Sequence, residues 1–381
     1  MREGGVIYSF PMSATKNPLS APPTYHVDVS YEENYQIGPF FSGPLPERKI
    51  SSPQNFMGFK VNSRFGVPAG PLLNSNWIAL YAKLGYDLLV YKTVRSRFYP
   101  AHPPPNCLYL NLFGQLDDKD FGQTLVAIDP LEKRDDSLPV SITNSFGMPS
   151  RAPSEWQADV GKAKASLSPG QLLIVSVVGT PGTGTSLEED YANGAILAKE
   201  AGADIVEINL SCPNVTTGEG SLFTDPVHSA KVSKKVHDAL RGTPLMLKLG
   251  YIPDAGLLES VILANAPNAE GISSINTLSF KVVGEGGVQA LPGPGRLQSG
   301  VCGAAIKSCG LKQAARTLDI RRRHRLDFSV IGVGGIMTAS DLLEYENIGV
   351  DAAMSATGAM WDPYLAYKYY LTTLSKTGNT D

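Results

Sequence analysis

The sequence has little charge, few cysteines and no zinc-ligand pattern. Only 18% of its 381 residues are charged, against roughly 25% in an average soluble domain, and 43% are hydrophobic. A large core is therefore expected and intrinsic disorder is not. The four cysteines, at 107, 212, 302 and 309, form no C-x-x-C pair, and the five histidines form no H-E-x-x-H pattern. We expect reduced thiols and no metal site.

The chain also lacks a basic stripe and a membrane segment. Its formal net charge is −3, and the one basic run, 321–325, is typical of a solvated helix end. No apolar stretch approaches the roughly 20 residues of a membrane span, and the N-terminus has no secretory signal pattern. We expect a cytoplasmic protein that binds neither nucleic acid nor membrane.

The chain has two parts that differ in composition and in hydrophobic periodicity. Residues 1–60 are rich in proline, tyrosine and small polar residues and show no helical or strand period. We expect them to form an N-terminal arm that wraps a main domain of residues 61–381. The arm offers aromatic side chains for burial, at Tyr31, Tyr35, Phe40, Phe41 and Phe56.

From Arg64 onward, short apolar runs alternate with longer helical patterns. Eight runs predict strands, at 65–70, 87–92, 172–178, 204–209, 244–248, 271–276, 328–333 and 350–355. Helices are predicted between most of them, at 74–84, 186–201, 226–240, 254–264, 338–346 and 360–375. The alternation predicts an α/β fold, a closed (β/α)8 TIM barrel. An open doubly wound sheet is the alternative.

Two intervals, 93–171 and 277–327, are too long for ordinary βα loops. We expect them to carry extra elements over the C-terminal face of the barrel, where the active sites of this fold lie. Such insertions would form the walls and lids of a substrate site.

Polar side chains stand at the ends of four predicted strands. These are Lys92, Asn209, Lys248 and Asn276, with Cys212 just beyond the fourth strand. Taken singly, each has an ordinary explanation, such as a turn-forming asparagine, a solvated lysine or a buried thiol. Together at one barrel mouth they would be costly to desolvate without a polar ligand. The pattern therefore favours a binding site.

Glycine-rich turns follow the last two predicted strands. Residues 332–335 read Gly-Val-Gly-Gly, and Thr357-Gly358 follows the eighth strand. Helices are predicted to begin nearby, close to Thr338 and Met360. Glycine allows close approach of the backbone, and amides at helix starts hold anions, so these turns predict a phosphate site.

Several segments together resemble the class 1 dihydroorotate dehydrogenases. They are Asn-Leu-Ser-Cys-Pro-Asn at 209–214, Asn-Ser-Phe-Gly at 144–147, Lys248-Leu249, Ile275-Asn276 and the 332–335 turn. The resemblance runs from about Arg64 to Tyr370. It implies an FMN-containing (β/α)8 barrel that oxidises dihydroorotate to orotate in pyrimidine biosynthesis. The cysteine of the motif is similar to that of the soluble, fumarate-type group, whose members are usually homodimers.

The resemblance also implies roles for single residues. Cys212 matches the base that removes a proton from C5 of dihydroorotate while hydride passes from C6 to flavin N5. Because a thiol with a pKa of about 8.5 is only slightly ionised at neutral pH, proton removal should quicken with alkalinity. The residues implied to bind substrate are Lys92, Asn144, Asn209, Asn214, Asn276 and Thr277. Those implied to bind FMN are Ala69, Gly70, Lys92, Thr93, Ser176, Asn209, Lys248, Gly303, Gly334, Gly335, Thr357 and Gly358.

The chain departs from the family pattern at three places. Residues 215–220 replace a Pro-Gly-Lys-Pro stretch, Ser150 replaces an asparagine, and Thr277 replaces a serine. These departures leave two alternatives open, an FMN-dependent dehydrogenase or ene-reductase of another dihydropyrimidine or cyclic enone, and a non-catalytic ligand-binding barrel. No G-x-G-x-x-G segment opens a βαβ unit, so the expected electron acceptor is fumarate or another small soluble molecule.

Overall fold

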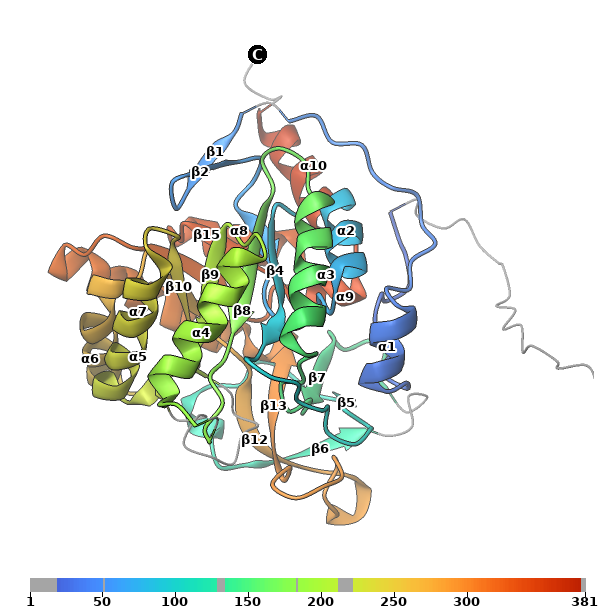
Figure 1. The fold of residues 1–381 in the computed structure, drawn as a ribbon. Helices are drawn as coiled ribbons and strands as arrows, with labels where there is room; N and C mark the ends of the chain where they lie inside the picture. The colour runs from blue at the N-terminus through green and yellow to red at the C-terminus, as the bar shows by residue number, and fades with distance from the viewer. Residues whose placement is uncertain (1–18, 51, 129–133, 183, 212–221, 378–381) are drawn as a thin grey trace, which may run out of the picture.

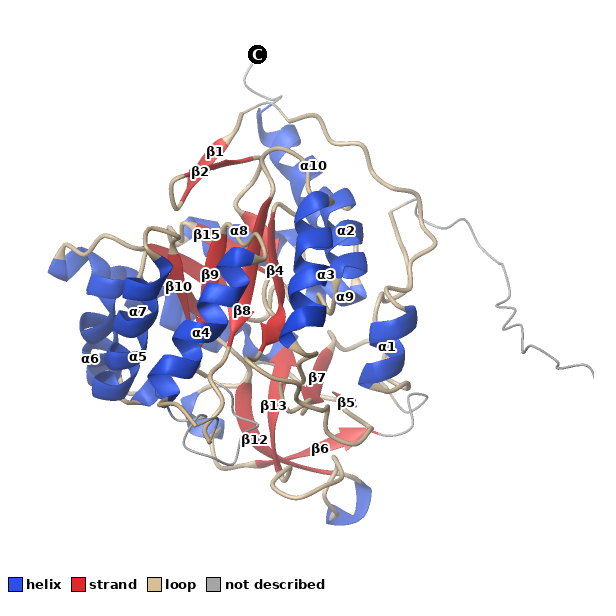
Figure 2. Ribbon diagram, viewed as in Figure 1, coloured by secondary structure: helices blue, strands red, loops and turns tan. Residues whose placement is uncertain are grey.

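A closed barrel of eight parallel strands forms the centre of the molecule, with helices around it (Figures 1 and 2). The computed structural model describes residues 19–50, 52–128, 134–182, 184–211 and 222–377. In order around the barrel the strands are β3 (Phe65–Val67), β4 (Leu88–Val94), β8 (Leu172–Val177), β9 (Ile205–Asn209), β10 (Leu245–Leu249), β11 (Gly271–Ser274), β14 (Ser329–Val333) and β15 (Ala352–Met354). Each overlaps one of the eight predicted runs, so the (β/α)8 prediction is confirmed.

Helices cover the outside of the barrel. Those matching predicted intervals are α2 (Ser75–Lys83), α4 (Leu187–Glu200), α5 (Pro226–Leu240), α6 (Ala255–Asn265) and α8 (Ala339–Asn347). The helix predicted over 360–375 is two helices, α9 (Thr357–Trp361) and α10 (Leu365–Thr377), separated at Pro363, which cannot continue a helix. Two further helices lie in the long intervals, α3 (Pro153–Ala165) and α7 (Lys307–His324). Neither was given a predicted range, although the run 321–325 was expected to be a helix end.

The basic run ends α7 as a solvated helix terminus, as predicted. Arg321 pairs with Asp351, while Arg323 pairs with Glu259 at 2.8 Å and with Asp319 at 2.8 Å. These carboxylates neutralise much of the local charge. Among the described helices, none combines the length and the apolar character needed to cross a bilayer.

The long intervals build a second sheet at the carboxyl ends of the barrel strands (Figure 2). Its five strands are β5 (Cys107–Leu110), β6 (Thr124–Ile128), β7 (Ser141–Asn144), β12 (Leu278–Val283) and β13 (Gln298–Gly303). The sheet closes on itself through a parallel pair of β6 with β12, and it has a small core that includes Phe280 and Val301. The expectation of extra elements over this end of the barrel is confirmed.

The barrel interior changes character along its length. Side chains alternate along each strand, so every second residue points inward. The amino-terminal half is apolar, with Val90, Ile174 and Met246 packed together. Nearer the carboxyl end, the same strands β4, β8 and β10 place Lys92, Ser176 and Lys248 inside. A packed hydrocarbon layer therefore supports a polar layer at the mouth.

The described part of the arm, residues 19–50 and 52–60, has more structure than the sequence indicated. It contains α1 (Tyr31–Ile37) and a hairpin of β1 (Gln54–Phe56) with β2 (Phe59–Val61). Ser30 and Glu33 form a capping box that starts α1. Of the five arm aromatics expected to be buried, Tyr31 and Phe56 are buried, and Phe56 packs with Val61 in the apolar cluster of the barrel interior. The other three, Tyr35, Phe40 and Phe41, are only partly buried.

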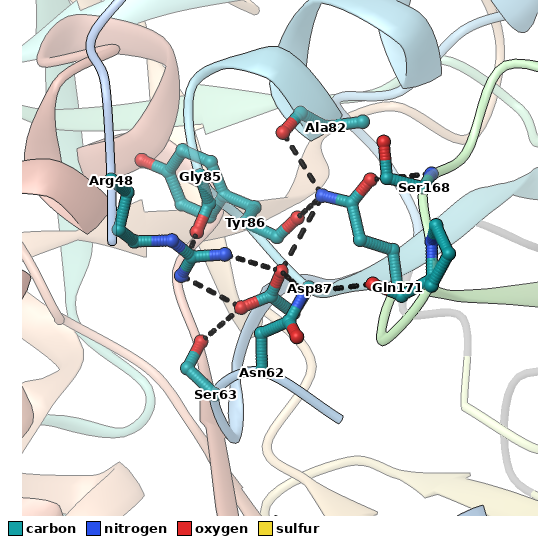
Figure 3. A network of polar contacts seen from close by, with 10 residues as sticks. Arg48, Asn62, Ser63, Ala82, Gly85, Tyr86, Asp87, Ser168 and Gln171 are labelled. Atoms are coloured by element: carbon teal, nitrogen blue, oxygen red, sulfur yellow. Dashed lines mark hydrogen bonds and ion pairs between the residues drawn. The ribbon is translucent and has the colours of Figure 1, made fainter. Parts of the chain in front are cut away.

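A buried ion pair fastens the arm to the amino-terminal end of the barrel (Figure 3). Arg48 donates to both carboxylate oxygens of Asp87, at 2.8 and 2.7 Å, and to the carbonyl oxygen of Gly85 at 3.0 Å. Ser63 also donates to Asp87, at 2.6 Å. The Asp87 side chain is fully buried, so its charge depends on these donors.

We expect Arg48→Met to lower the free energy of unfolding by about 3 kcal/mol, because it leaves the Asp87 carboxylate buried without its cation. Ser63 still donates a hydrogen bond to Asp87, so the loss of stability should lie at the lower end of the range for a broken buried ion pair. Urea unfolding followed by circular dichroism measures it. Lys83→Met, which removes an exposed lysine of α2, is the matched control and should change stability by less than about 0.5 kcal/mol. Equal effects of the two substitutions would contradict the role of this ion pair.

Candidate active site at the carboxyl end of the barrel

A cavity of about 170 Å³ opens between the barrel mouth and the five-stranded sheet. It is lined by most of the residues that the sequence singled out. These are Ala69, Gly70, Lys92, Thr93, Asn144, Asn209, Lys248, Asn276, Thr277, Gly303, Gly334, Gly335, Thr357 and Gly358. They come from seven barrel strands or the turns after them and from β7 and β13, so the fold gathers segments that lie far apart in the chain.

Three predicted site residues are not among those lining the cavity. Ser176 is fully buried inside the barrel, where its hydroxyl accepts a hydrogen bond from Thr93 at 3.0 Å. It supports Thr93, which does line the cavity, and does not reach the wall itself. Cys212 and Asn214 lie outside the described residues.

Two buried lysines give the cavity its positive charge. Lys248 is only 4% exposed, and its Nζ donates to Ser273 Oγ at 3.3 Å. Burial lowers the pKa of Lys248 to about 8. Lys92 is 8% exposed, with its Nζ 5.9 Å from the centre of the Phe146 ring. With a pKa of about 8, Lys248 keeps its charge at neutral pH, so the cavity suits an anionic group.

A buried carboxylate lies close to Lys248. Glu207 of β9 is fully buried, and within the described part of the chain neither of its oxygens has a hydrogen-bond partner. Burial raises the pKa of Glu207, an effect opposed by Lys248 and by the nearby Ser176 hydroxyl. In turn, Glu207 holds the pKa of Lys248 higher than burial alone would set it. The sequence analysis did not single out Glu207.

Two cavity asparagines hold the residue that precedes Cys212. Asn276 donates through Nδ2 to the carbonyl oxygen of Ser211 at 2.6 Å and to its hydroxyl at 3.2 Å. The Oδ1 of Asn209 accepts the Ser211 N–H at 3.1 Å. Ser211 is itself buried. Ser211 is therefore a fixed point beside the cavity, and Cys212 is the next residue in the chain.

A second thiol, Cys302, lies within the cavity. Its Sγ accepts from Asn144 Nδ2 at 3.4 Å and from Thr357 Oγ1 at 3.5 Å. Burial raises the pKa of Cys302 to about 11 and that of Cys107, which also lines the cavity, well above its usual value. Neither thiol is ionised to a useful extent at neutral pH, so neither suits the role of a base.

The arm supplies part of the cavity wall, which the sequence analysis did not predict. Tyr25 and Tyr31 both line the cavity and both pack edge-on against Phe146, with ring centres 6.2 and 6.0 Å apart. The position of Tyr25 is fixed by its neighbour Thr24, whose N–H donates to the carbonyl oxygen of Met360 at 2.9 Å. No local sequence signal marks such a wall, because it arises only when the arm folds back.

Glycines at the last two strand ends form a close-fitting cradle. Gly335 has φ +69°, and a Cβ there would lie 2.4 to 2.5 Å from backbone and Cβ atoms of Lys307. At Gly358, at the start of α9, a Cβ would lie 2.2 Å from the carbonyl oxygen of Ile336. Side chains are excluded at both places, so only glycine allows the backbone to pack this closely beside the cavity.

The architecture and the site define a class. A parallel (β/α)8 barrel whose mouth joins buried lysines, amide side chains and a glycine cradle after its last two strands is typical of an enzyme that binds a phosphate-bearing cofactor. Comparisons with known proteins identify the family within that class. The dihydroorotate dehydrogenase family model matches residues 134–371.

Individual relatives agree. The chain is 38% identical over 364 residues to a dihydroorotate dehydrogenase of Dictyostelium discoideum, covering 91% of this chain and 96% of that protein. It is 31% identical over 169 residues, 44% of this chain and 51% of the relative, to a dihydroorotate dehydrogenase A (fumarate) of Limosilactobacillus reuteri. A solved structure of Eimeria tenella DHODH in complex with ferulenol has a TM-score of 0.65 and 17% identity, covering 84% of both chains.

The chain therefore belongs to the dihydroorotate dehydrogenase family, whose enzymes are FMN flavoproteins that oxidise CH–CH groups. The residues present fit FMN. The glycine cradle suits a phosphate, the open left-handed turn at Gly70 (φ +141°) leaves room beside the cavity, and the two buried lysines suit a ring that carries negative charge when reduced.

We expect Gly335→Ala to weaken FMN retention by about tenfold or more, because the new methyl group would displace the Lys307 backbone and close the cradle. Absorbance of the purified protein at flavin wavelengths, per mole of chain, measures it. Gly349→Ala is the matched control, since Gly349 has φ +93° but no atom within 4 Å of an added Cβ. It should cost about 1–2 kcal/mol of stability and no FMN. Full flavin content in Gly335→Ala would contradict the proposed cradle.

Proposed function

We propose that this chain oxidises dihydroorotate to orotate with bound FMN, using Cys212 as the base, and passes the electrons to a small soluble acceptor such as fumarate. The observation that carries the proposal is the tether at Ser211. Asn209 and Asn276 fix this residue against a cavity that holds two buried lysines. The next residue in the chain is Cys212.

The cavity side chains suit the substrate chemically. Carboxamides both donate and accept hydrogen bonds, which matches a cyclic imide, so Asn144, Asn209 and Asn276 would orient the ring. Asn214, from the same motif as Cys212, would join them. FMN, when bound, supplies the two-electron acceptor for the oxidation. Lys92 and Lys248 would stabilise negative charge on the substrate carboxylate and on the cofactor.

Thiol chemistry in the cavity supports Cys212 as the base. Cys302 and Cys107 keep their protons because burial raises the pKa of each. Cys212 directly follows Ser211, and the two asparagines that fix Ser211 also line the cavity that would hold the substrate. Ser176 then supports the site indirectly, through Thr93.

Three further features belong to the proposal. The acceptor would be fumarate, used at the same cavity. The protein would be cytoplasmic and would act as a homodimer. The chain would consist of an arm, 1–60, and a barrel domain, 61–381. The arm would form part of the active site, which agrees with the place of Tyr25 and Tyr31 in the cavity wall.

Anaerobic spectroscopy tests the proposal. The purified protein should show flavin absorbance, dihydroorotate should bleach it, and fumarate should restore it. Bleaching by dihydrouracil but not by dihydroorotate would replace the proposed substrate with another dihydropyrimidine. Absorbance that no dihydro-ring bleaches would indicate a ligand-binding barrel. Recovery with NAD⁺ but not fumarate would overturn the proposed acceptor alone.

A further inference from the structure

Arg296 is a buried guanidinium behind one wall of the cavity. It lies just before β13, and only 2% of it is exposed. Its Nε donates to Ser145 Oγ at 3.2 Å, and its terminal nitrogens donate to the carbonyl oxygens of Pro103 (2.8 Å), Pro105 (3.0 Å), Ser145 (2.7 Å) and Pro292. Five acceptors for five N–H groups leave the guanidinium no donor for a ligand.

The positive charge of Arg296 has no counter-ion. Within the described residues it forms no ion pair, and burial, with no anion opposing it, lowers its pKa to about 10. Its neighbour His102, whose Nδ1 lies 3.2 Å from Ser145 Oγ, has a pKa lowered first by burial and then by Arg296. Arg296 is therefore charged and His102 neutral at pH 7, and the cluster is positive.

The residues held by Arg296 belong to the cavity wall. Ser145 stands between Asn144 and Phe146, which both line the cavity. The Ser145 N–H donates to the carbonyl oxygen of Asn106 at 2.9 Å, and the His102 N–H donates to that of Phe146 at 3.0 Å. One guanidinium thus ties the segments around residues 103–105, 145 and 292 into a single support.

A neutral group or a water molecule could satisfy the same carbonyl oxygens. A buried cation without a carboxylate carries a desolvation cost that such a group would avoid. Part of this cost is offset when an anion occupies the neighbouring cavity, because charges interact strongly where water is excluded. The observations therefore fit a residue that acts on an anionic ligand without touching it.

We propose that Arg296 is a positioning residue that holds the Asn144–Phe146 wall and gives the cavity a permanent positive potential, which favours a carboxylate-bearing ring over its uncharged analogue. This inference rests on the proposed function, since it assumes that a carboxylate-bearing pyrimidine binds in the cavity. Arg296 would then help to select the charge of the ligand, although it lies behind the residues that contact the ligand.

Binding of a matched ligand pair to the FMN-loaded protein tests the inference. Orotate and its neutral carboxamide, orotamide, differ in charge and little in shape, and their dissociation constants are read from the perturbation of flavin absorbance. We expect Arg296→Gln to weaken the binding of orotate by about tenfold relative to that of orotamide. Arg296→Lys keeps the charge and should preserve the ratio of the two constants within about threefold, even if both ligands bind more weakly.

Arg316→Gln, which removes a half-buried cation of α7 that does not line the cavity, is the control for net charge and should leave the ratio unchanged. Equal weakening of both ligands in Arg296→Gln would reduce Arg296 to a structural clamp and overturn the electrostatic role. A large change in the ratio of the two dissociation constants in Arg296→Lys would also overturn the electrostatic role. The measurement on Arg296→Lys still tests the inference if Arg296→Gln does not fold. Failure of the wild-type holoprotein to bind orotate would instead refute the proposed function.

Discussion

Cys212→Ser is expected to lower the rate of dihydroorotate oxidation by about 10²- to 10⁴-fold while leaving FMN bound. A thiol with an ordinary pKa of about 8.5 supplies some thiolate near neutral pH, whereas a serine hydroxyl ionises far above that range. The rise of the wild-type rate toward about pH 8 should therefore move to higher pH in the variant. Anaerobic stopped-flow measurement of flavin bleaching between pH 6 and 10 gives both quantities.

Cys309→Ser is the matched control for this experiment. Cys309 is buried on α7, where its Sγ donates to the carbonyl oxygen of Leu116 at 3.4 Å, and it does not line the cavity. The same atom exchange there should leave the rate within about twofold. If Cys212→Ser kept the wild-type rate and pH profile, the base would have to be another group, and Cys302, with a pKa raised to about 11, would be a poor replacement.

The barrel could be predicted because its strands are buried on both faces. Such strands appear as continuous apolar runs, as in Leu172–Val177, and the intervening helices carry the caps that mark their starts. The five-stranded sheet gave no comparable signal. Its strand β6 (Thr124–Ile128) alternates exposed and buried residues, and its strands pair across both long intervals.

The helices that were missed have weak local signals. Neither α3 nor α7 has a side-chain hydrogen bond at its N-cap, and α7 ends in the basic run that the sequence analysis had assigned to a helix end. The seven-residue α1 is too short to show a period, although its capping box, Ser30 with Glu33, was available as a signal.

The residues of the candidate site also fall into those that could be predicted from the sequence and those that could not. Lys92, Asn209, Lys248 and Asn276 could be placed together because the carboxyl ends of parallel strands meet at one face of a barrel. Tyr25, Cys302 and Arg296 could not, because their positions depend on how the arm and the two insertions fold over that face. Glu207 could have been found, since a carboxylate two residues before Asn209 on the same strand must also point into the barrel.

The rate of the reaction should also depend on pH through the ionisation of Lys248, which adds a falling side to the pH profile. Its pKa of about 8 lies below the ordinary value of 10.5, so the folded protein releases this proton before the unfolded chain does. Holding Lys248 charged therefore costs stability below pH 8, and the cost disappears as the pH rises from about 8 to 10.5. The stabilising charge in the cavity is lost over the start of the same range, so the rate should fall above about pH 8 even as Cys212 ionises.

Lys248→Met is expected to remove that falling side, to lower the rate by about 10²- to 10³-fold and to lower the midpoint potential of bound FMN by about 60 mV or more. The reason is that the variant loses the buried cation facing the charge that develops in the cavity. The pKa of Glu207 should then rise further, because burial already raises it and Lys248 no longer opposes this. Spectroelectrochemical titration at pH 7 measures the potential independently of turnover.

The control for this variant is Lys164→Met, which removes a lysine paired with Asp204 at 2.6 Å, away from the cavity. It should leave the potential unchanged. An unchanged potential in Lys248→Met would exclude an electrostatic role for this lysine and leave Lys92 as the cation that acts on the cofactor. A potential that falls while the falling side above pH 8 persists would separate the two effects, and would assign the alkaline loss of rate to a group other than Lys248.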